Sequence, residues 1–250
     1  MKYRTMGEKC LIFIPTYNES DNVRRLLPAI LEQGLDCDIL FMDDNSPDGT
    51  GKVLDEFADE HPRVHVVHRP GKQGIGSAHQ AGIAWAYEHG YAWLITMDSD
   101  FAHPPEYLPD FLAAAEQGVD VVVGSRYLRR TGLPGWSLRR RILTRTGHFL
   151  TLTMLGMPYD ATGAFRFYRL TSVPHEAFKL VGSTGYSFFF ESLYILHVNR
   201  FSIRQIPIHL PGRTFGTSKM DGGEVATSLR LLLSLFVRKL FTPRRFRISP

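Results

Sequence analysis

Short apolar runs alternate with amphipathic segments through the first half of the chain. Five runs have the length of buried strands, at 10–14, 39–42, 64–67, 94–97 and 119–123. Between them, apolar residues recur at helical spacing over 23–31, 53–57, 77–87 and 107–116. Such alternation is typical of β-α-β units with right-handed crossovers, so we predict an α/β fold with a mainly parallel sheet flanked by helices.

The alternation is less regular after residue 124. We predict helices over 138–155, 188–198 and 225–241, and strands over 162–168 and 201–208. No repeat, low-complexity tract or interdomain linker separates the two halves. At 250 residues the chain could form one large domain or two small ones, and the apolar share of 44% supports a substantial core, which excludes a disordered chain.

Polar residues follow three of the predicted strands at 15–19, 43–50 and 98–103. The carboxyl ends of parallel strands lie at one edge of a sheet, where open α/β folds bind their ligands. We therefore expect these three loops to converge on one site.

Two carboxylates, Asp98 and Asp100, stand one residue apart where the 94–97 run ends, and Pro104 and Pro105 then stop the strand. Two close carboxylates repel each other unless a cation lies between them. One interpretation is therefore a divalent-metal site for a diphosphate substrate. The other is a turn or capping pair, and this stretch alone does not decide between them.

Several common nucleotide and hydrolase motifs are absent. The glycine-rich segment 71–76 places Lys72 ahead of its glycines and lacks the Ser or Thr of a phosphate loop. It also lacks the dinucleotide-binding spacing, and the chain has no G-x-S-x-G elbow. A Rossmann dehydrogenase and a serine hydrolase are thus disfavoured.

Positive charge gathers in the second half of the chain. The net charge is +4, but 121–159 holds seven arginines and no carboxylate, and no carboxylate follows Glu224. We expect these regions to face something anionic. The two cysteines, Cys10 and Cys37, form no metal motif, and a reduced, cytosolic setting is the default.

The predicted helix over 225–241 is apolar almost all round and flanked by arginines, yet no apolar run approaches the roughly 20 residues that span a bilayer. We favour an interfacial helix on an anionic membrane over a core helix packed on the sheet.

The polar residues of these loops suit a nucleotide-sugar transferase. Tyr17 can flank a base, while Glu19 and Asp44 can accept hydrogen bonds from base and ribose. Three basic residues can hold phosphate charge: Arg126, Arg213 and Lys219. Alternatively, Glu19 caps a helix, and Arg213 and Lys219 are solvated loop charges.

An ordered set of motifs resembles the inverting family 2 glycosyltransferases, and within them the polyprenol (dolichol) monophosphate mannose synthases. In chain order the motifs are P-T-Y-N-E at 15–19, D-D-N-S-P-D-G-T at 43–50, G-K-x-G-x-G at 71–76, D-x-D at 98–100, S-R-Y at 125–127, G-W at 135–136, T-G-x-F-R at 162–166 and R-x-x-G-x-S-K at 213–219. Each motif is loose alone, but the ordered set is specific and extends over about 11–240.

The resemblance implies a GT-A fold, GDP-mannose as donor and Mg²⁺ or Mn²⁺ as cofactor. By motif position, the guanosine site would be lined by Pro15, Tyr17, Glu19, Met42 and Asp44. The metal and diphosphate would be held by Asp98, Ser99 and Asp100, with both aspartates as metal ligands. The donor diphosphate or lipid phosphate would be bound by Arg126, Arg213 and Lys219. Asp100 and Arg126 are the expected catalytic residues.

One departure from the family pattern bears on the metal. Many relatives place a glutamine ligand where this chain has Ala102, so metal binding is expected to be weaker or completed by water. Ser99 replaces the usual alanine, which is a small change. On this interpretation residues 1–220 form the catalytic domain and 221–250 a basic, amphipathic, membrane-associating tail.

An ionised polyprenyl phosphate can attack the anomeric carbon without a protein base, whereas a sugar hydroxyl would need one. We expect an enzyme on the cytosolic face of a membrane, with a small membrane subunit as a possible partner. UDP-glucose or another nucleotide sugar is the close rival as donor. An inactive, membrane-docking paralogue is a weaker alternative, and nucleic-acid binding is not expected.

Overall fold

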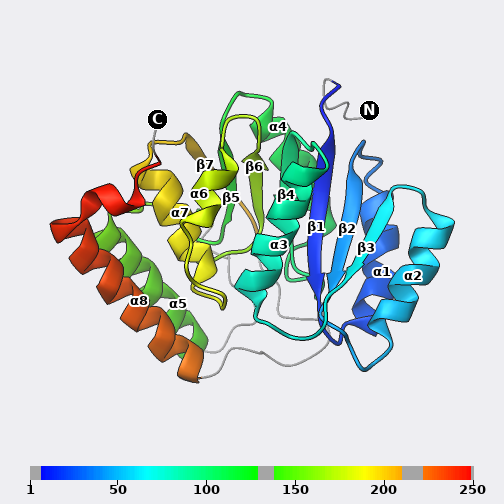
Figure 1. Cartoon of the computed structure of the whole chain (residues 1–250), viewed down its shortest axis with the longest axis horizontal. Helices are drawn as coiled ribbons and strands as arrows, with labels where there is room; N and C mark the ends of the chain where they lie inside the picture. Colours follow the sequence, from blue (N-terminus) through cyan, green and yellow to red (C-terminus); the bar gives the residue numbers. More distant parts are fainter. Residues whose placement is uncertain (1–6, 129–137, 210–221, 249–250) are drawn as a thin grey trace.

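The computed structural model describes residues 7–128, 138–209 and 222–248, and a single mixed sheet forms its centre (Figure 1). The strands run in the order β3-β2-β1-β4-β6-β5-β7. Their bounds are β1 Cys10–Thr16, β2 Asp38–Asp43, β3 Val64–His68, β4 Trp93–Thr96, β5 Val121–Ser125, β6 Arg166–Arg169 and β7 Ile203–Pro207. The α/β class and the predominantly parallel sheet are as predicted.

Helices cover both faces of this sheet. They are α1 Ser20–Leu31, α2 Thr50–Glu60, α3 Ile75–Glu88, α4 Leu108–Ala115, α5 Leu138–Leu150, α6 His175–Lys179, α7 Phe188–Val198 and α8 Gly222–Phe241. Shorter turns of helix are η1 Pro105–Tyr107, the π-helical η2 Thr151–Leu155 and η3 Pro243–Phe246. The long helix predicted over 138–155 is therefore α5 followed by one π-helical turn.

Two hydrophobic clusters result from the alternation of side chains along the strands. Leu11 and Phe13 of β1 point to one face, where α3, α6, α7 and α8 supply the partners. Cys10, Ile12 and Ile14 point to the other, which α1, α2 and α4 cover. The central strands are buried on both faces, and this explains their continuous apolar runs.

β6 departs from the mainly parallel arrangement of the sheet. It lies between β4 and β5 and is antiparallel to both. Consequently β4 and β5 are parallel to each other, and their carboxyl ends share the edge formed by β1 and β2. The predicted strand over 162–168 begins later than expected, at Arg166, because 160–165 forms a connection at this same edge.

The last helix has two different faces. Leu232 and Leu235 of α8 are buried in the core cluster. Leu229, Leu233 and Leu240 are exposed. Within the described parts of the chain, no helix is both long and apolar enough to cross a membrane.

Candidate active site

The loops after β1, β2 and β4 meet at one edge of the sheet, as predicted. β1 pairs in parallel with β2 on one side and β4 on the other, so all three carboxyl ends are neighbours. Pro15 is paired with Met42, and both are buried one residue before their strands end. These two predicted site residues therefore lie beneath the loops.

The loops after β1 and β2 are bound to each other by hydrogen bonds from main-chain N–H groups. Asn18 N–H donates to Ser46 Oγ at 2.9 Å, and Glu19 N–H donates to Thr50 Oγ1 at 2.9 Å. Ser20 N–H donates to Asp48 Oδ2 at 3.1 Å. Asn18 adopts φ +55°, a left-handed conformation that asparagine tolerates better than most residues. These bonds hold the two loops in a defined relative position.

Glu19 occupies the N-cap position of α1, yet its carboxylate makes no capping bond. Oε2 instead accepts a 2.6 Å hydrogen bond from Asn22 Nδ2. The neighbouring Tyr17 is half-buried, and Lys72 Nζ of the glycine-rich loop lies 5.1 Å from the centre of its ring. A cation over an aromatic face is attractive, so this contact brings the 71–76 segment to the site.

Asp43 and Asp44 have different roles. Asp43 is a turn residue: Oδ1 and Oδ2 accept hydrogen bonds from the hydroxyl and N–H of Ser46. Asp44 forms an ion pair with Arg69, with Oδ1 and Nη1 2.9 Å apart and both side chains buried. Burial raises the pKa of Asp44, although Arg69 acts in the opposite direction.

The Asp44–Arg69 pair retains unused hydrogen-bonding capacity. Asp44 Oδ1 and Arg69 Nη1 form no hydrogen bond of regular geometry. Arg69 is fixed by its other nitrogen, Nη2, which donates to Ser77 Oγ at 2.7 Å and Gln73 Oε1 at 3.1 Å. Buried polar atoms with free capacity are suited to meet a polar ligand. The sequence did not single out Arg69, whose only signal was its place at the start of the glycine-rich loop.

The loop after β4 carries both predicted metal ligands in a strained turn. Asp100 is buried, and its Oδ1 accepts the Ala102 N–H at 3.0 Å. Asp98 is about one-third exposed. Phe101, between Asp100 and Ala102, has φ +59°, a conformation that non-glycine residues rarely adopt. Backbone strain of this kind gathers at functional sites.

His103 holds this loop through a hydrogen bond and was not among the predicted site residues. Its Nδ1 accepts the Asp98 N–H at 2.8 Å, and its ring packs 5.0 Å from Phe165. Since Nδ1 is the acceptor, the imidazole proton is on Nε2. The ring is 3% exposed, so His103 positions the loop and is not open to solvent.

Asp98 and Asp100 fit a hard divalent cation. Within the described ranges, no cluster of three or more His, Cys, Asp and Glu side chains has metal-binding geometry. Mg²⁺ is usually bound by only one or two carboxylates together with water and substrate phosphates. Ala102 supplies no ligand atom from its side chain, as expected from the sequence. The neighbouring Ser99 is buried.

Arg126 follows β5 at the same edge and is held by a buried aspartate. Asp160 Oδ2 accepts hydrogen bonds from Arg126 N–H at 3.0 Å and from Nε at 2.7 Å, while Oδ1 pairs with Nη2. Thr162 Oγ1 accepts a further bond from Nη2 at 2.6 Å. Asp160 raises the pKa of Arg126 against the opposing effect of burial.

Asp160 and Thr162 lie in the segment that precedes β6. Because both are distant from Arg126 in the sequence, their hydrogen bonds with Arg126 could not be predicted from the sequence. Arg213 and Lys219, the other two predicted phosphate ligands, lie outside the described residues.

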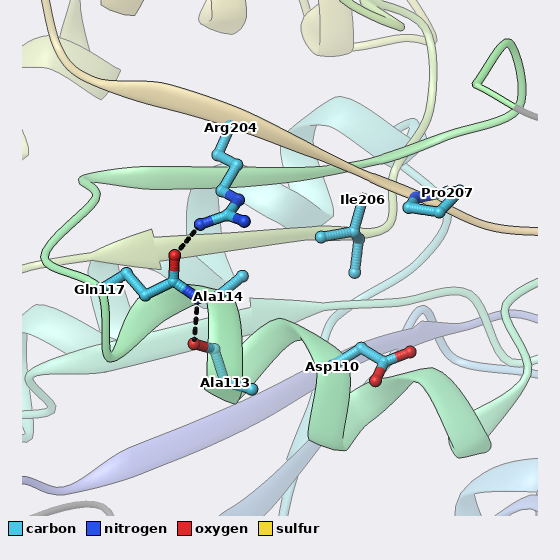
Figure 2. Close-up of a pocket in the computed structure, with 7 residues that line it drawn as sticks. All are labelled: Asp110, Ala113, Ala114, Gln117, Arg204, Ile206 and Pro207. Atoms are coloured by element: carbon cyan, nitrogen blue, oxygen red, sulfur yellow. Dashed lines mark hydrogen bonds between the residues drawn. The ribbon is translucent and has the colours of Figure 1, made fainter.

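Two pockets lie among the described residues. One, of about 420 Å³, is lined by the glycine-rich loop, by 182–187 and by the start of α8. Figure 2 shows the other, about 220 Å³, between α4 and β7. Gln117, just after α4, and Arg204 of β7 are joined by a hydrogen bond at one end of it, and Asp110 and Pro207 lie at the other. None of the predicted site residues lines either pocket.

Comparison with known proteins finds relatives along most of the chain. The family model described as "Glycosyl transferase family 2" matches residues 11–180. Polyprenol monophosphomannose synthase of Mycolicibacterium smegmatis is 36% identical over 224 residues, which are 89% of this chain and 84% of that protein. Undecaprenyl-phosphate mannosyltransferase of Micrococcus luteus is 36% identical over 222 residues, 88% of this chain and 91% of that protein.

Solved structures resemble the fold. Glucosyl-3-phosphoglycerate synthase from Mycobacterium tuberculosis, in complex with Mn²⁺, UDP-glucose and phosphoglyceric acid, has a TM-score of 0.68 at 18% identity. The match covers 93% of this chain and 81% of that one. At this identity the likeness establishes the shared GT-A-type architecture alone.

Proposed function

Because the chain belongs to glycosyl transferase family 2, we propose that it transfers mannose from GDP-mannose to a polyprenyl phosphate. The observation that carries this proposal is that Asp98, Asp100 and Arg126 follow strands whose carboxyl ends lie at one edge of the sheet, beside the loops after β1 and β2. Two relatives that match along most of their length are named for mannose transfer to polyprenol or undecaprenyl phosphate, which supports both the sugar and the acceptor class.

The nucleoside would lie over the loops after β1 and β2. Tyr17 offers a ring face, and Glu19 offers a carboxylate whose position is set by Asn22. Asp44 and Arg69 together present a hydrogen-bond acceptor and donors. A buried donor or acceptor that lacks a hydrogen-bond partner costs free energy. The polar edge of a base could supply the missing partners, so such a pair can recognise it.

Asp98 and Asp100 would hold Mg²⁺ or Mn²⁺ against the diphosphate of the donor. The bound cation would neutralise the charge that develops on the departing nucleoside diphosphate. Ser99 would lie between the two ligands, and His103 would keep the Asp98 main chain in place through its hydrogen bond. With alanine at 102, the site relies on these two carboxylates and on water.

The acceptor phosphate needs no proton removed by the protein, since it is ionised near neutral pH. The role of this chain is then to bind and orient two anions. Arg126 would direct its guanidinium to a phosphate oxygen, with Asp160 and Thr162 fixing its plane. Arg213 and Lys219 would add positive charge. Attack in line with the leaving group would invert the anomeric centre and give a β-linked product.

We also propose that residues 221–250 bind the cytosolic face of a membrane, where the acceptor lipid resides. Exposed leucines on α8 and the carboxylate-free sequence after Glu224 support this role. Apolar burial and attraction to anionic lipids would act together.

A panel of radiolabelled donors tests the assignment. With a polyprenyl phosphate and Mg²⁺ or Mn²⁺, GDP-mannose should give radioactivity in the organic phase, and UDP-glucose should not. Turnover of UDP-glucose alone would refute the choice of mannose. Asp100→Asn should remove the activity, whereas Asp110→Asn, at an exposed aspartate on α4, should retain it.

A further inference from the structure

One glutamine of the edge strand β7 contacts the segment that carries Asp160. Gln205 Oε1 accepts a hydrogen bond from the Asp160 N–H at 3.0 Å, and Gln205 Nε2 donates to the Pro158 carbonyl oxygen at 3.1 Å. The side-chain amide therefore uses its acceptor and one donor on two residues that lie 45 and 47 positions away in the sequence. These two bonds hold the segment 158–160 against β7.

The register of three neighbouring strands places a second side chain beside the same segment. Val123 of β5 is paired with Arg166 of β6 on one side and with Gln205 of β7 on the other. Paired residues project from the same face of a sheet, so Arg166 and Gln205 project on the same side. Arg166 Nη2 donates to the Ala161 carbonyl oxygen at 2.8 Å. The main chain is thus held on both sides of Asp160.

The position of Asp160 determines the position of Arg126. Gln205 holds the main chain of Asp160, while the Asp160 carboxylate accepts hydrogen bonds from the N–H, Nε and Nη2 of Arg126. A carboxylate that binds two nitrogens of one guanidinium determines the plane of that group. A displacement of the segment 158–160 would therefore turn the guanidinium.

The hydrogen bonds of Arg126 leave one nitrogen for a ligand. Nε is bound by Asp160, and Nη2 is bound by Asp160 and Thr162. Among the described residues, Nη1 forms no hydrogen bond, so Nη1 is the nitrogen that can meet a phosphate oxygen. Because the rest of the guanidinium is occupied, the direction of Nη1 depends on where Asp160 lies.

From these contacts we infer that Gln205 is a positioning residue for the reaction and acts on Arg126 through Asp160. The inference rests on the proposed function, which makes Arg126 a phosphate ligand, and extends it to a strand that contains none of the predicted site residues. Gln205 is uncharged and half-buried, so it neither neutralises a charge nor fills the core. Its contribution is geometric, and a misplacement of about 1 Å can lower a rate by about 100-fold.

A double-mutant cycle on mannosyl transfer tests the inference. The full-length variants are Gln205→Leu, Arg126→Lys and the two combined, assayed in detergent with GDP-mannose, Mn²⁺ and a polyprenyl phosphate. Gln205→Leu removes both hydrogen bonds of the amide at similar side-chain size. Arg126→Lys keeps a positive charge beside Asp160 but lacks the planar fork of the guanidinium.

We expect Gln205→Leu to lower kcat/KM by about tenfold in the unmodified protein. In the Arg126→Lys background the same substitution should change kcat/KM by less than about twofold, because residues that act as a unit are not additive. Gln117→Leu is the matched control and should keep full activity. Gln117 also contacts β7, through a hydrogen bond from Arg204, and forms none with the segment 158–160.

Hydrogen exchange measured residue by residue follows the same link without any substrate. The Arg126 N–H donates to Asp160 Oδ2, so it should exchange faster in Gln205→Leu if Asp160 is displaced. The N–H groups of β1 should exchange at unchanged rates, which separates a local displacement from a general loss of stability.

Unchanged kcat/KM in Gln205→Leu would overturn the inference, and so would an equal loss in the Arg126→Lys background. Unaltered exchange of the Arg126 N–H in Gln205→Leu would also overturn it. Full activity of Arg126→Lys would instead show that the proposed function is wrong about Arg126. The exchange rate of the Arg126 N–H then still decides whether Gln205 positions that residue.

Discussion

Removing the Asp160 carboxylate should destabilise the fold more than any surface substitution. Asp160 is fully buried and accepts three hydrogen bonds from Arg126, whose own side chain is 8% exposed. Asp160→Ala would leave the Arg126 guanidinium buried, with Thr162 as its remaining hydrogen-bond partner among the described residues. Removing one member of a buried pair typically costs about 3–5 kcal/mol, and we expect a loss of unfolding free energy in that range.

Urea unfolding at pH 7, followed by tryptophan fluorescence, measures this cost. A double variant, Arg126→Met/Asp160→Leu, should recover most of the loss, because an apolar pair leaves no charge unpaired. Asp36→Ala is the matched control: Asp36 pairs with Arg63 on the surface and should contribute less than about 1 kcal/mol. A cost below about 1 kcal/mol for Asp160→Ala would refute the reasoning, as would a double variant less stable than the single one.

The same pair gives a pH dependence of defined sign. Burial alone would raise the pKa of Asp160, but the Arg126 guanidinium outweighs burial and holds that pKa below its ordinary value. The pair therefore stabilises the protein above the unfolded carboxyl pKa of about 3.9, and the contribution is lost as the pH falls through the lower folded pKa. The unmodified protein and Asp160→Ala should converge in stability at that acidic end.

Three further outcomes are expected. Asp100→Ala should abolish transfer while circular dichroism and the unfolding midpoint show an intact fold; unchanged turnover would remove its assigned role. Gly82→Ala should cost about 1–3 kcal/mol in urea unfolding, because the new Cβ would lie 2.2 Å from Phe13 Cε2, whereas Gly147→Ala meets nothing within 4 Å and should be tolerated. Burial lowers the pKa of His79 to about 3. As the pH falls, the unfolded chain therefore protonates His79 before the folded protein does. The free energy of unfolding should fall between about pH 6.5 and 3 by up to about 1.4 kcal/mol per pH unit. His79→Leu should flatten that slope in unfolding curves at pH 7, 5.5 and 4, and an unaltered slope would contradict the assignment.

The central sheet could be predicted because its strands are buried on both faces. Segments such as 39–42 and 94–97 are apolar without interruption, and polar loops end them at one edge, so local pattern and tertiary position agree. The direction of β6 could not be predicted, since an apolar run has the same pattern in either direction. Its antiparallel placement depends on long-range pairing with β4 and β5.

The position of the candidate site could be predicted where acidic residues directly follow an apolar strand, as at Asp98 and Asp100, which the structure places in the loop after β4. Contacts between distant segments were not predictable. The sequence predicted Arg126 as a phosphate ligand, but its partner Asp160 is 34 residues away and resembles an ordinary loop residue in the sequence. Likewise, the ion pair between Arg69 and Asp44 joins segments that are separated in the sequence and could not be predicted from it. Helix α8 in the tail is a third case. It has one face buried in the core and another apolar face that is exposed, and the hydropathy of the sequence does not distinguish the two faces.

Titration calorimetry of GDP-mannose, with and without Mn²⁺, tests the central claim most directly. The account predicts binding that is stronger with the metal and is lost in a folded Asp98→Asn/Asp100→Asn variant. Failure of the intact, folded protein to bind either Mn²⁺ or any sugar nucleotide would contradict it.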